Sequence, residues 1–396
     1  MTDILGATGR CILFGGLFLA IAVPAQAAKF KVVYVFQGGN DAASPIGGVN
    51  RDGTKLYGTT YYGGTSNLGT VYKLGTGGTE TVLHSFAGGS DGANPEAGLT
   101  ADAKGTLFGT TYSGGTHGLG TVFKITRKGH ETVLYSFCPN YPHCNDGFDP
   151  SAGLIIDAGG NLYGTTYAGG AGSLGVVFKV APDGTQTVLY SFKGGNDGAD
   201  PNAAVIADPK GNFYGTTYGG GTSGLGTVFE LAANGTESVL YSFKGGSDGA
   251  NPFTSLILDA NGNLYGTTYS GGSSNHGTVF KLAPDGTETV LYTFAGGSDG
   301  TSPDSSLTAD ARGNLYGTTL YGGDTADCSG NGCGTVFKLA PDGTKTILHA
   351  FTGSDGAQPS ANFVAGNRGE LISTTYNGGN TGCGGTGCGV IYKIRK

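Results

Sequence analysis

Residues 264–269 read Leu-Tyr-Gly-Thr-Thr-Tyr, and this hexapeptide is the clearest copy of a motif that recurs along the chain. Seven copies of its Tyr-Gly-Thr-Thr-Tyr core can be aligned, and they begin at Tyr57, Phe108, Tyr163, Tyr214, Tyr265, Tyr316 and Ile372. The repeat length is roughly fifty residues, and units of about 40 to 50 residues with several short β-runs are typical of a β-propeller.

One unit, residues 255–294, shows how each repeat gives four strands. Short runs rich in apolar and β-branched residues lie at 255–259, 264–269, 277–282 and 288–294. The first two runs are separated by Asn261-Gly262 and the last two by Pro284-Asp285-Gly286, which are turn signals. A glycine-rich loop separates the second run from the third. Four strands in a meander make one propeller blade.

The two ends of the chain carry complementary parts of one unit. Residues 32–36 match the fourth strand of the repeat, and the C-terminus stops after 389–394, which match the third. We therefore predict an all-β fold, a seven-bladed β-propeller with four antiparallel strands per blade. The N-terminal strand 31–36 joins the C-terminal blade, so that no sheet edge stays open. The alternative is an open β-solenoid, which would not need its missing last strand supplied from the other end.

The composition fits an ordered all-β chain. Of 396 residues, 79 are glycines, which suits many tight turns. Aromatic residues make up 10% of the chain, an apolar content that a disordered glycine-rich chain lacks. The formal net charge of −7 argues against a nucleic-acid or anionic-membrane partner.

Residues 1–27 resemble a secretory signal peptide. An apolar run over 11–23 is followed by Ala25-Gln26-Ala27, a small-x-small triplet that suits cleavage before Ala28. We expect a single propeller domain over 28–396, without a membrane span, that is secreted or periplasmic and monomeric. The alternative is an uncleaved membrane anchor.

Six cysteines follow the predicted signal, and they form three close pairs: Cys138/Cys144, Cys328/Cys333 and Cys383/Cys388. An even number of cysteines in an exported chain predicts disulfides. A competing interpretation joins the last four cysteines in a zinc site, but their spacing is wider than the common two-residue knuckle.

Every repeat also has an aspartate four residues before a proline in the crossover between blades, as Asp-Gly-x-x-Pro in six copies and as Asp41-Ala42-Ala43-Ser44-Pro45 in the first. Its aspartates are Asp41, Asp91, Asp146, Asp197, Asp248, Asp299 and Asp355. In propellers that close in this way, the crossovers and the second-to-third-strand loops share one face, here called the variable face because it holds all the length variation. A ring of carboxylates there could bind calcium. The alternative is an Asx-turn that shapes the crossover, with no cofactor bound.

Other candidate residues are predicted on the same face. His117 and His276 occupy equivalent loops, and we include them with the aspartates as candidate binding residues. Tyrosines that end the second strand, such as Tyr167, Tyr218 and Tyr269, could stack on sugars or pack between blades. Glu96, Asp149 and Asp200 could form a carboxylate pair for glycoside cleavage, which depends on their separation.

The units resemble the GloVer tandem repeat of exported bacterial proteins. The resemblance rests on residues 264–269, on Gly-Thr-Val-Phe-Lys-Leu at 277–282 and on Gly-Gly-Ser-Asp-Gly-Ala-Asn-Pro at 245–252, and it covers the chain after residue 27. It implies export and a propeller-like fold, and it implies no catalytic residue.

Two functions remain open at this point. The first is an exported binding or scaffold module, with carbohydrate or another exported protein as partner. The second is a polysaccharide-active enzyme, a glycoside hydrolase or lyase, with its site at the channel mouth. Non-repeated acids, histidines or tyrosines converging there would favour the enzyme. We expect ligand contacts from the segments 138–150, 321–333 and 377–388, because loops that vary over a constant scaffold usually carry function.

Overall fold

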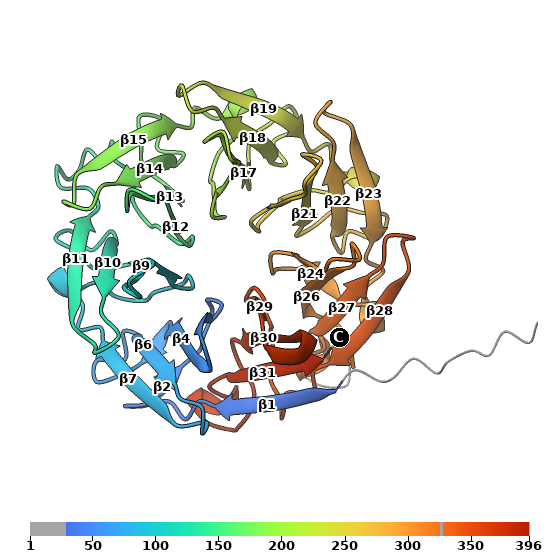
Figure 1. Ribbon diagram of the computed structural model, residues 1–396. Helices are drawn as coiled ribbons and strands as arrows, with labels where there is room; N and C mark the ends of the chain where they lie inside the picture. The colour runs from blue at the N-terminus through green and yellow to red at the C-terminus, as the bar shows by residue number, and fades with distance from the viewer. Residues whose placement is uncertain (1–28, 325–327, 396) are drawn as a thin grey trace, which may run out of the picture.

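The computed structural model describes residues 29–324 and 328–395. In these residues, seven antiparallel units of four strands stand in a ring around a central channel (Figure 1). The prediction of an all-β, seven-bladed propeller is confirmed. The predicted signal peptide, 1–27, lies outside the described residues.

The strands of a blade are ordered from the channel outwards. The first strands are β3 (Asn50–Asp52), β8 (Thr100–Ala101), β12 (Ile155–Ile156), β16 (Ile206–Ala207), β20 (Ile257–Leu258), β25 (Thr308–Ala309) and β29 (Val364–Ala365). The second strands are β4 (Lys55–Thr60), β9 (Leu107–Thr111), β13 (Leu162–Thr166), β17 (Phe213–Thr217), β21 (Leu264–Thr268), β26 (Leu315–Tyr321) and β30 (Glu370–Thr375).

The third strands are β6 (Thr70–Leu74), β10 (Thr121–Ile125), β14 (Val176–Val180), β18 (Thr227–Leu231), β22 (Thr278–Leu282), β27 (Thr335–Leu339) and β31 (Val390–Arg395). The outermost strands are β7 (Glu80–Ser85), β11 (Glu131–Ser136), β15 (Gln186–Ser191), β19 (Glu237–Ser242), β23 (Glu288–Thr293), β28 (Lys345–Ala350) and β1 (Phe30–Val35). Blades 1 to 7 are numbered in this order, and β1 is the outermost strand of blade 7.

The ring closes where the N-terminal strand joins the last blade. β1 pairs antiparallel with β31, with Phe30 opposite Ile394 and Val35 opposite Val390 (Figure 1). The backbone N–H of Phe36 extends the pairing by donating to the carbonyl of Gly389 over 3.1 Å. The predicted closure is confirmed, with strand bounds shifted by one residue from 31–36.

The Tyr-Gly-Thr-Thr core is explained by packing within and between blades. A Cβ on Gly266 would lie 2.7 Å from the ring tip of Phe280, so the glycine makes room for an aromatic side chain on the third strand. In blade 5, the hydroxyl of Thr268 shares a hydrogen bond with that of Thr278 over 2.9 Å and joins the second and third strands. The motif is therefore a structural requirement of the blade.

Aromatic pairs hold neighbouring blades together. The phenylalanine that follows each outermost strand meets a ring on the third strand of the next blade, edge to face, with centroids 5.1–5.3 Å apart. Phe243 and Phe280 are one such pair, and both are fully buried. The apolar core thus consists of clusters between blades, such as the one that joins Phe243 to Leu282.

The crossovers and the second-to-third-strand loops lie on the same face, as predicted. β2 (Ala42–Ala43) of a crossover pairs with β5 (Tyr62–Gly63), and β24 (Thr301–Pro303) pairs with β26. Short 3₁₀ turns occupy this face, except η6, which lies between β29 and β30. They are η1 (Gly89–Asp91), η2 (Gly195–Asp197), η3 (Gly246–Asp248), η4 (Gly297–Asp299), η5 (Cys328–Gly330), η6 (Asn367–Gly369) and η7 (Cys383–Gly385).

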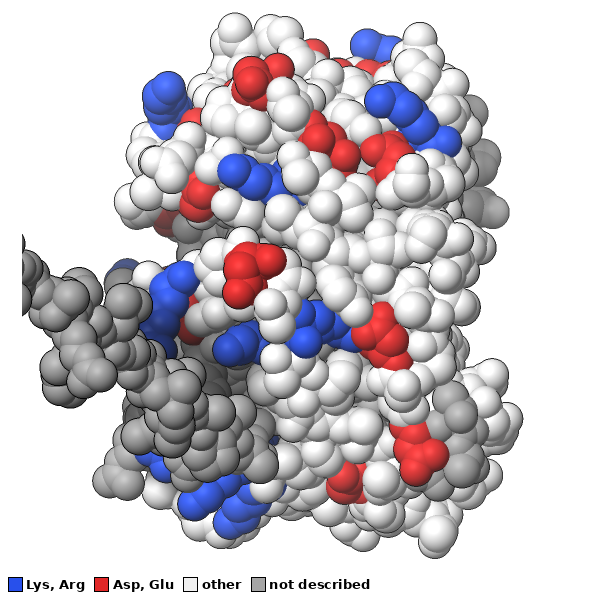
Figure 2. Space-filling view, turned by 90° about the vertical axis from the view of Figure 1, so that its right-hand side faces the viewer, with Lys and Arg blue, Asp and Glu red and all other residues white. Residues whose placement is uncertain are grey.

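Three disulfides staple single segments of this face. They join the predicted partners, Cys138–Cys144, Cys328–Cys333 and Cys383–Cys388, so the four-cysteine zinc site is excluded. Disulfides are typical of an oxidising, extracytoplasmic compartment. Within residues 29–324 and 328–395, no helix is long and apolar enough to span a bilayer. Figure 2 shows acidic and basic side chains interspersed over one side of the ring.

Candidate functional site

The central channel contains a cavity of about 740 Å³. Its wall is formed mainly by the segments that lead from each crossover proline toward the first strand, such as 46–49, 96–99 and 360–363. The seven positions that directly follow these prolines hold six kinds of side chain, with serine in two blades: Ile46, Glu96, Ser151, Asn202, Phe253, Asp304 and Ser360. The channel mouth, defined by this ring of seven residues, is where the repeats depart from one another.

The backbone at the channel mouth is the same in every blade. The residue before each proline is left-handed, with φ between 54° and 59°, as at Asn251 and Ser302. Its N–H donates to a carbonyl in the loop of the preceding blade, as from Asn251 to Leu225 over 2.7 Å. The following side chain is therefore held at one position in the wall, and only its chemistry changes.

Two acids stand in this wall. Burial, together with the charge of Asp149, raises the pKa of Glu96 to about 7. Burial also raises the pKa of Asp304 to about 7, and its Oδ1 is buried without a hydrogen-bond partner in the described residues. Groups with shifted pKa values in a concave site are candidates for function.

Asp149 and Asp200 precede the prolines of blades 3 and 4 and lie beside the wall. Burial raises the pKa of Asp149 to about 6, against a hydrogen bond from Tyr112 that lowers it. Burial raises the pKa of Asp200 as well. Glu96, Asp149 and Asp200 were expected near this face, whereas Asp304 was missed. The one signal for it was that the residue after the proline varies while the proline does not.

Aromatic residues surround the mouth. In six blades tyrosine follows the Thr-Thr pair of the second strand, at Tyr61, Tyr112, Tyr167, Tyr218, Tyr269 and Tyr376, and in blade 6 Leu320 takes its place. Burial, followed by the charge of Glu96, raises the pKa of Tyr61 to about 12, and burial, followed by the charge of Asp200, raises the pKa of Tyr167. Neighbouring phenols add smaller contributions to both pKa shifts. Phe253 stands between Tyr218 and Tyr269, with centroids 6.0 and 6.2 Å away. The mouth therefore offers aromatic faces and hydroxyls together.

The cavity wall carries no positive charge in the described residues. Its polar groups are carboxyls, amides and hydroxyls, and no lysine, arginine or histidine of the described chain lines it. Such a wall suits an uncharged polar ligand or a cation, and it lacks the donors that bind phosphate or carboxylate groups.

A family profile matches most of the chain. The sequence profile of the Gloeobacter/Verrucomicrobia repeat matches residues 14–143 and 139–330. The chain belongs to this repeat family. The resemblance inferred from the motifs at 264–269, 277–282 and 245–252 is thereby confirmed. No curated protein matches the chain.

Solved structures resemble this Gloeobacter/Verrucomicrobia repeat protein in fold alone. The extracellular domain of a proposed one-component system from B. thetaiotaomicron aligns at 10% identity with a TM-score of 0.58, over 92% of this chain and 40% of that one. The chain thus spans less than half the length of that relative. A proposed 6-phosphogluconolactonase from Bacteroides uniformis aligns at 17% identity with a TM-score of 0.52, over 81% of this chain and 89% of that one.

The predicted aspartates of the repeat lie away from the channel. None of the seven, Asp41, Asp91, Asp146, Asp197, Asp248, Asp299 and Asp355, lines the cavity. Each carboxylate is bonded to its own outermost strand. Asp248, for example, accepts the N–H of Lys244 over 2.6 Å and the hydroxyl of Tyr241 over 2.5 Å. The structure thus shows how they shape the crossover, and a ligand role for them stays a prediction.

The predicted histidines also lie outside the cavity wall. His117 stacks on Tyr141, with centroids 5.8 Å apart, and Tyr141 is 64% exposed. His276 forms a hydrogen bond to the hydroxyl of Thr301 over 2.9 Å. Both contacts belong to loops and crossovers of the variable face, so their role in binding stays a prediction.

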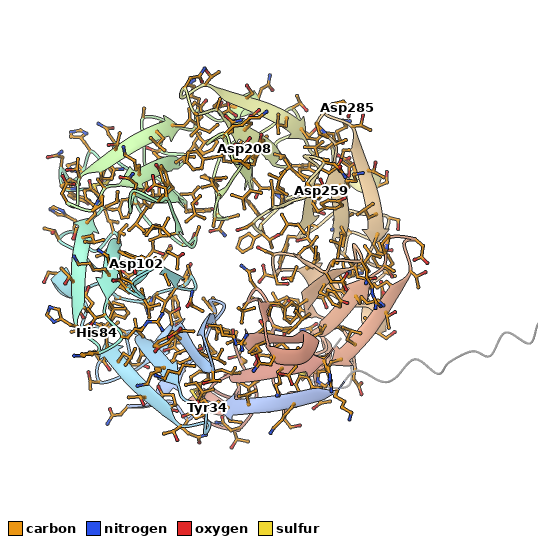
Figure 3. All side chains as sticks on the ribbon, viewed as in Figure 1. Tyr34, His84, Asp102, Asp208, Asp259 and Asp285 are labelled. Atoms are coloured by element: carbon orange, nitrogen blue, oxygen red, sulfur yellow. A yellow bond between two sulfur atoms is a disulfide. The ribbon has the colours of Figure 1, made fainter. Side chains whose placement is uncertain are left out.

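The repeats form a second polar zone at their outer edge, which we call the outer seams. At each outer seam, an aromatic residue of one outermost strand and the crossover aspartate meet the first residue of the next outermost strand. Figure 3 labels Tyr34 and His84, which lie at this edge of the ring. The meeting residues are Tyr34/Asp41/Glu80, His84/Asp91/Glu131, Tyr135/Asp146/Gln186, Tyr190/Asp197/Glu237, Tyr241/Asp248/Glu288, Tyr292/Asp299/Lys345 and His349/Asp355/Phe30.

Carboxyl pairs at four of these outer seams shift toward the protonated form. Burial, followed by a hydrogen bond to Asp41 and its charge, raises the pKa of Glu80 to about 8. Burial and the charge of Asp91 raise the pKa of Glu131 to about 7. Burial and the charge of the neighbouring aspartate also raise the pKa values of Glu237 and Glu288 to about 7. A like charge nearby disfavours ionisation, so each aspartate makes its glutamate neighbour easier to protonate.

Proposed function

We propose that this protein is an exported carbohydrate-binding module whose channel mouth binds an uncharged saccharide. The observation that carries the proposal is the ring of seven equivalent positions with six kinds of side chain in one cavity wall, in a protein whose strand motifs repeat. Binding sites of small molecules are concave, with aromatic and apolar walls and a few placed polar groups.

The chemistry of the mouth supports a sugar. Phe253 and the tyrosines around it present ring faces on which a pyranose can lie, and their hydroxyls can bond its edge. Asn202, Ser151 and Ser360 add neutral donors and acceptors to the same wall. These groups match the alternating apolar faces and hydroxyl edges of a saccharide.

The lack of basic groups in the described cavity wall favours an uncharged saccharide over a phosphorylated one. Sugar phosphates require charge-assisted donors, usually from arginine or lysine. The phosphorylated substrate for which the Bacteroides uniformis protein is named would find no lysine, arginine or histidine in the described wall of this cavity. Secretion or periplasmic location, which the three disulfides support, would bring the protein to polysaccharides outside the cell.

A glycan array followed by calorimetric titration tests the proposal. We expect wild-type protein to bind at least one neutral glycan, and Phe253→Ala and Asp304→Asn each to weaken it by about tenfold, which is 1.4 kcal/mol. Asp285→Asn is the matched control, because Asp285 is an exposed hairpin residue at the outer edge (Figure 3) and should leave binding unchanged. Binding of phosphorylated sugars in place of neutral ones would contradict the proposal.

A second candidate function is glycoside cleavage at the same mouth. The supporting observation is that Glu96 and Asp149 interact and differ, with pKa values raised to about 7 and about 6. Near neutral pH, one could remain protonated as a general acid while the other is ionised. This meets in part the criterion set out from the sequence, since non-repeated acids converge at the mouth.

Product analysis separates the two functions. Each glycan that binds is incubated with the protein, and its products are separated by chromatography. If the protein is an enzyme, new reducing ends should appear, and Glu96→Gln should abolish them while glycan binding persists. Intact glycan after prolonged incubation leaves the binding module as the function.

A further inference from the structure

The outer seam between blades 1 and 2 gathers three metal-ligating side chains. One ligand atom each from His84, Asp91 and Glu131 lies within 4.8 Å of the other two. His84 Nε2 is 2.9 Å from Asp91 Oδ1. The other oxygen of Asp91 accepts the N–H of Ala87 over 2.6 Å, which orients the carboxylate toward the histidine. The group therefore needs only a small contraction to surround one ion.

The two carboxyls at this outer seam have an imidazole beside them and no lysine or arginine partner among the described residues. Glu131 Oε1 is buried and has no hydrogen-bond partner among the described residues. A buried carboxyl beside a second carboxyl requires either a shared proton or a cation.

Four other outer seams either place a lysine beside their acids or lack the glutamate. Lys193 and Lys244 interact with the acids Glu237 and Glu288. Between blades 5 and 6, Lys345 replaces the glutamate and forms an ion pair with Asp299 over 2.7 Å. At the outer seam between blades 2 and 3 the glutamate is replaced by glutamine, Gln186.

Each of the two remaining outer seams lacks one of the three ligand groups. Tyr34, Asp41 and Glu80 keep the acid pair but offer a phenol in place of the imidazole. His349 and Asp355 keep the imidazole, but Phe30 stacks on His349 at 3.6 Å where the glutamate would stand. Among the described outer seams, only the one between blades 1 and 2 combines an imidazole with two carboxylates.

We propose that His84, Asp91 and Glu131 bind one divalent transition-metal ion, zinc, which clamps blade 1 to blade 2. Imidazole nitrogen and carboxylate oxygen bind zinc at about 2.0–2.2 Å, and water completes a tetrahedral site with three protein ligands. A first-row metal fits this set better than calcium, which takes six to eight oxygen ligands. The site lies at the outer edge, so it is independent of the function of the channel mouth.

Zinc titration of metal-stripped, tag-free protein tests the proposal. We expect calorimetry and elemental analysis to give one zinc ion per chain, and zinc to raise the melting temperature. His84→Tyr, which installs the residue of five other outer seams, should abolish both effects. His349→Tyr is the matched control and should keep both.

Two more variants keep the test decisive if His84→Tyr folds poorly. Glu131→Gln copies the natural Gln186 of another outer seam and should also lose the zinc ion. Tyr34→His completes the ligand set beside Asp41 and Glu80 and should raise the stoichiometry to two. Wild-type protein that binds no zinc, or His84→Tyr and Glu131→Gln variants that bind it as wild type does, would overturn the proposal.

Discussion

The outer seams and the channel mouth are built from the same short crossover segment, which runs from the aspartate to the residue after the proline. The aspartate at the outer seam is constant, whereas the residue at the mouth varies. At the outer seams the aspartate is present seven times and always bonds its own outermost strand, as Asp197 does through the N–H of Lys193. At the mouth, a few residues further on, the side chain after the proline changes in nearly every blade. Repetition therefore marks the scaffold, and departure from it marks the candidate site.

The largest expected effect comes from opening the ring. Deleting residues 29–36 removes β1 and with it Phe36, which packs on Tyr72 of blade 1. Blade 7 would lose its outer strand and the ring its closure, so we expect loss of the cooperative thermal transition, because blades cannot bury both faces alone. Calorimetry measures this, and an unchanged melting temperature would show that the closure is dispensable.

The next effect concerns an outer seam that relies on a buried ion pair. The side chain of Lys345 is 4% exposed, and its ammonium contacts Asp299. Lys345→Met should lower the free energy of unfolding by about 3 kcal/mol, because it leaves a carboxylate unpaired. Urea unfolding gives the value, with Lys281→Met on a third strand as control. Equal losses in both variants would mean that the ion pair contributes nothing special.

Disulfides should matter less, and only locally. Each closes a short segment on the variable face, so Cys383→Ser with Cys388→Ser should cost about 2 kcal/mol in the chain-entropy model. Hydrogen exchange should speed up over 377–388 while β31 stays protected. Exchange that rises equally throughout blade 7 would contradict this local role.

A smaller effect depends on pH at the outer seams. The pKa of Glu80 is about 8 in the folded protein and ordinarily 4.5, so the folded state holds a proton that the unfolded state has lost between these values. Stability contributed by this group is therefore full below pH 4.5 and falls as the pH rises to about 8. Glu80→Gln, which stays neutral, should be more stable than wild type by about 1 kcal/mol at pH 9, after allowance for solvent screening, and equal to it at pH 4.

Gln186→Glu supplies the reciprocal test, because it would create a new acid pair with Asp146. Its melting temperature should fall more steeply between pH 5 and pH 9, about the range set by the glutamate pKa shifts, than that of wild type. Parallel curves for the wild type and both variants would show that the outer seams do not titrate in this way.

The overall architecture could be predicted from the sequence. The period and the matching chain ends predicted the blades, their closure and the shared face of crossovers and loops. The close spacing of Cys328 and Cys333 predicted their bond. These features depend on local order along the chain, which the repeats display directly.

The direction in which a side chain points could not be predicted from the sequence. The aspartates were expected in a ring on the variable face, and they lie on that face with their carboxylates turned toward the outermost strands. Asp248, for example, accepts hydrogen bonds from the hydroxyl of Tyr241 and the N–H of Lys244. Asp304 and Phe253 enter the channel wall through a turn whose geometry depends on the preceding blade. Contacts between blades decide both, and a single repeat does not contain them.

The most direct measurement of the central claim compares binding and stability in two variants at once. The glycan with the strongest array signal is titrated into wild type, into Phe253→Ala combined with Asp304→Asn, and into Glu80→Gln, and the melting temperature of each is recorded at pH 9. The account predicts that the mouth variant loses at least about tenfold in affinity with its stability nearly unchanged, whereas the outer-seam variant gains stability and binds as wild type does. No glycan binding by the wild type, or full binding by the mouth variant, would contradict it.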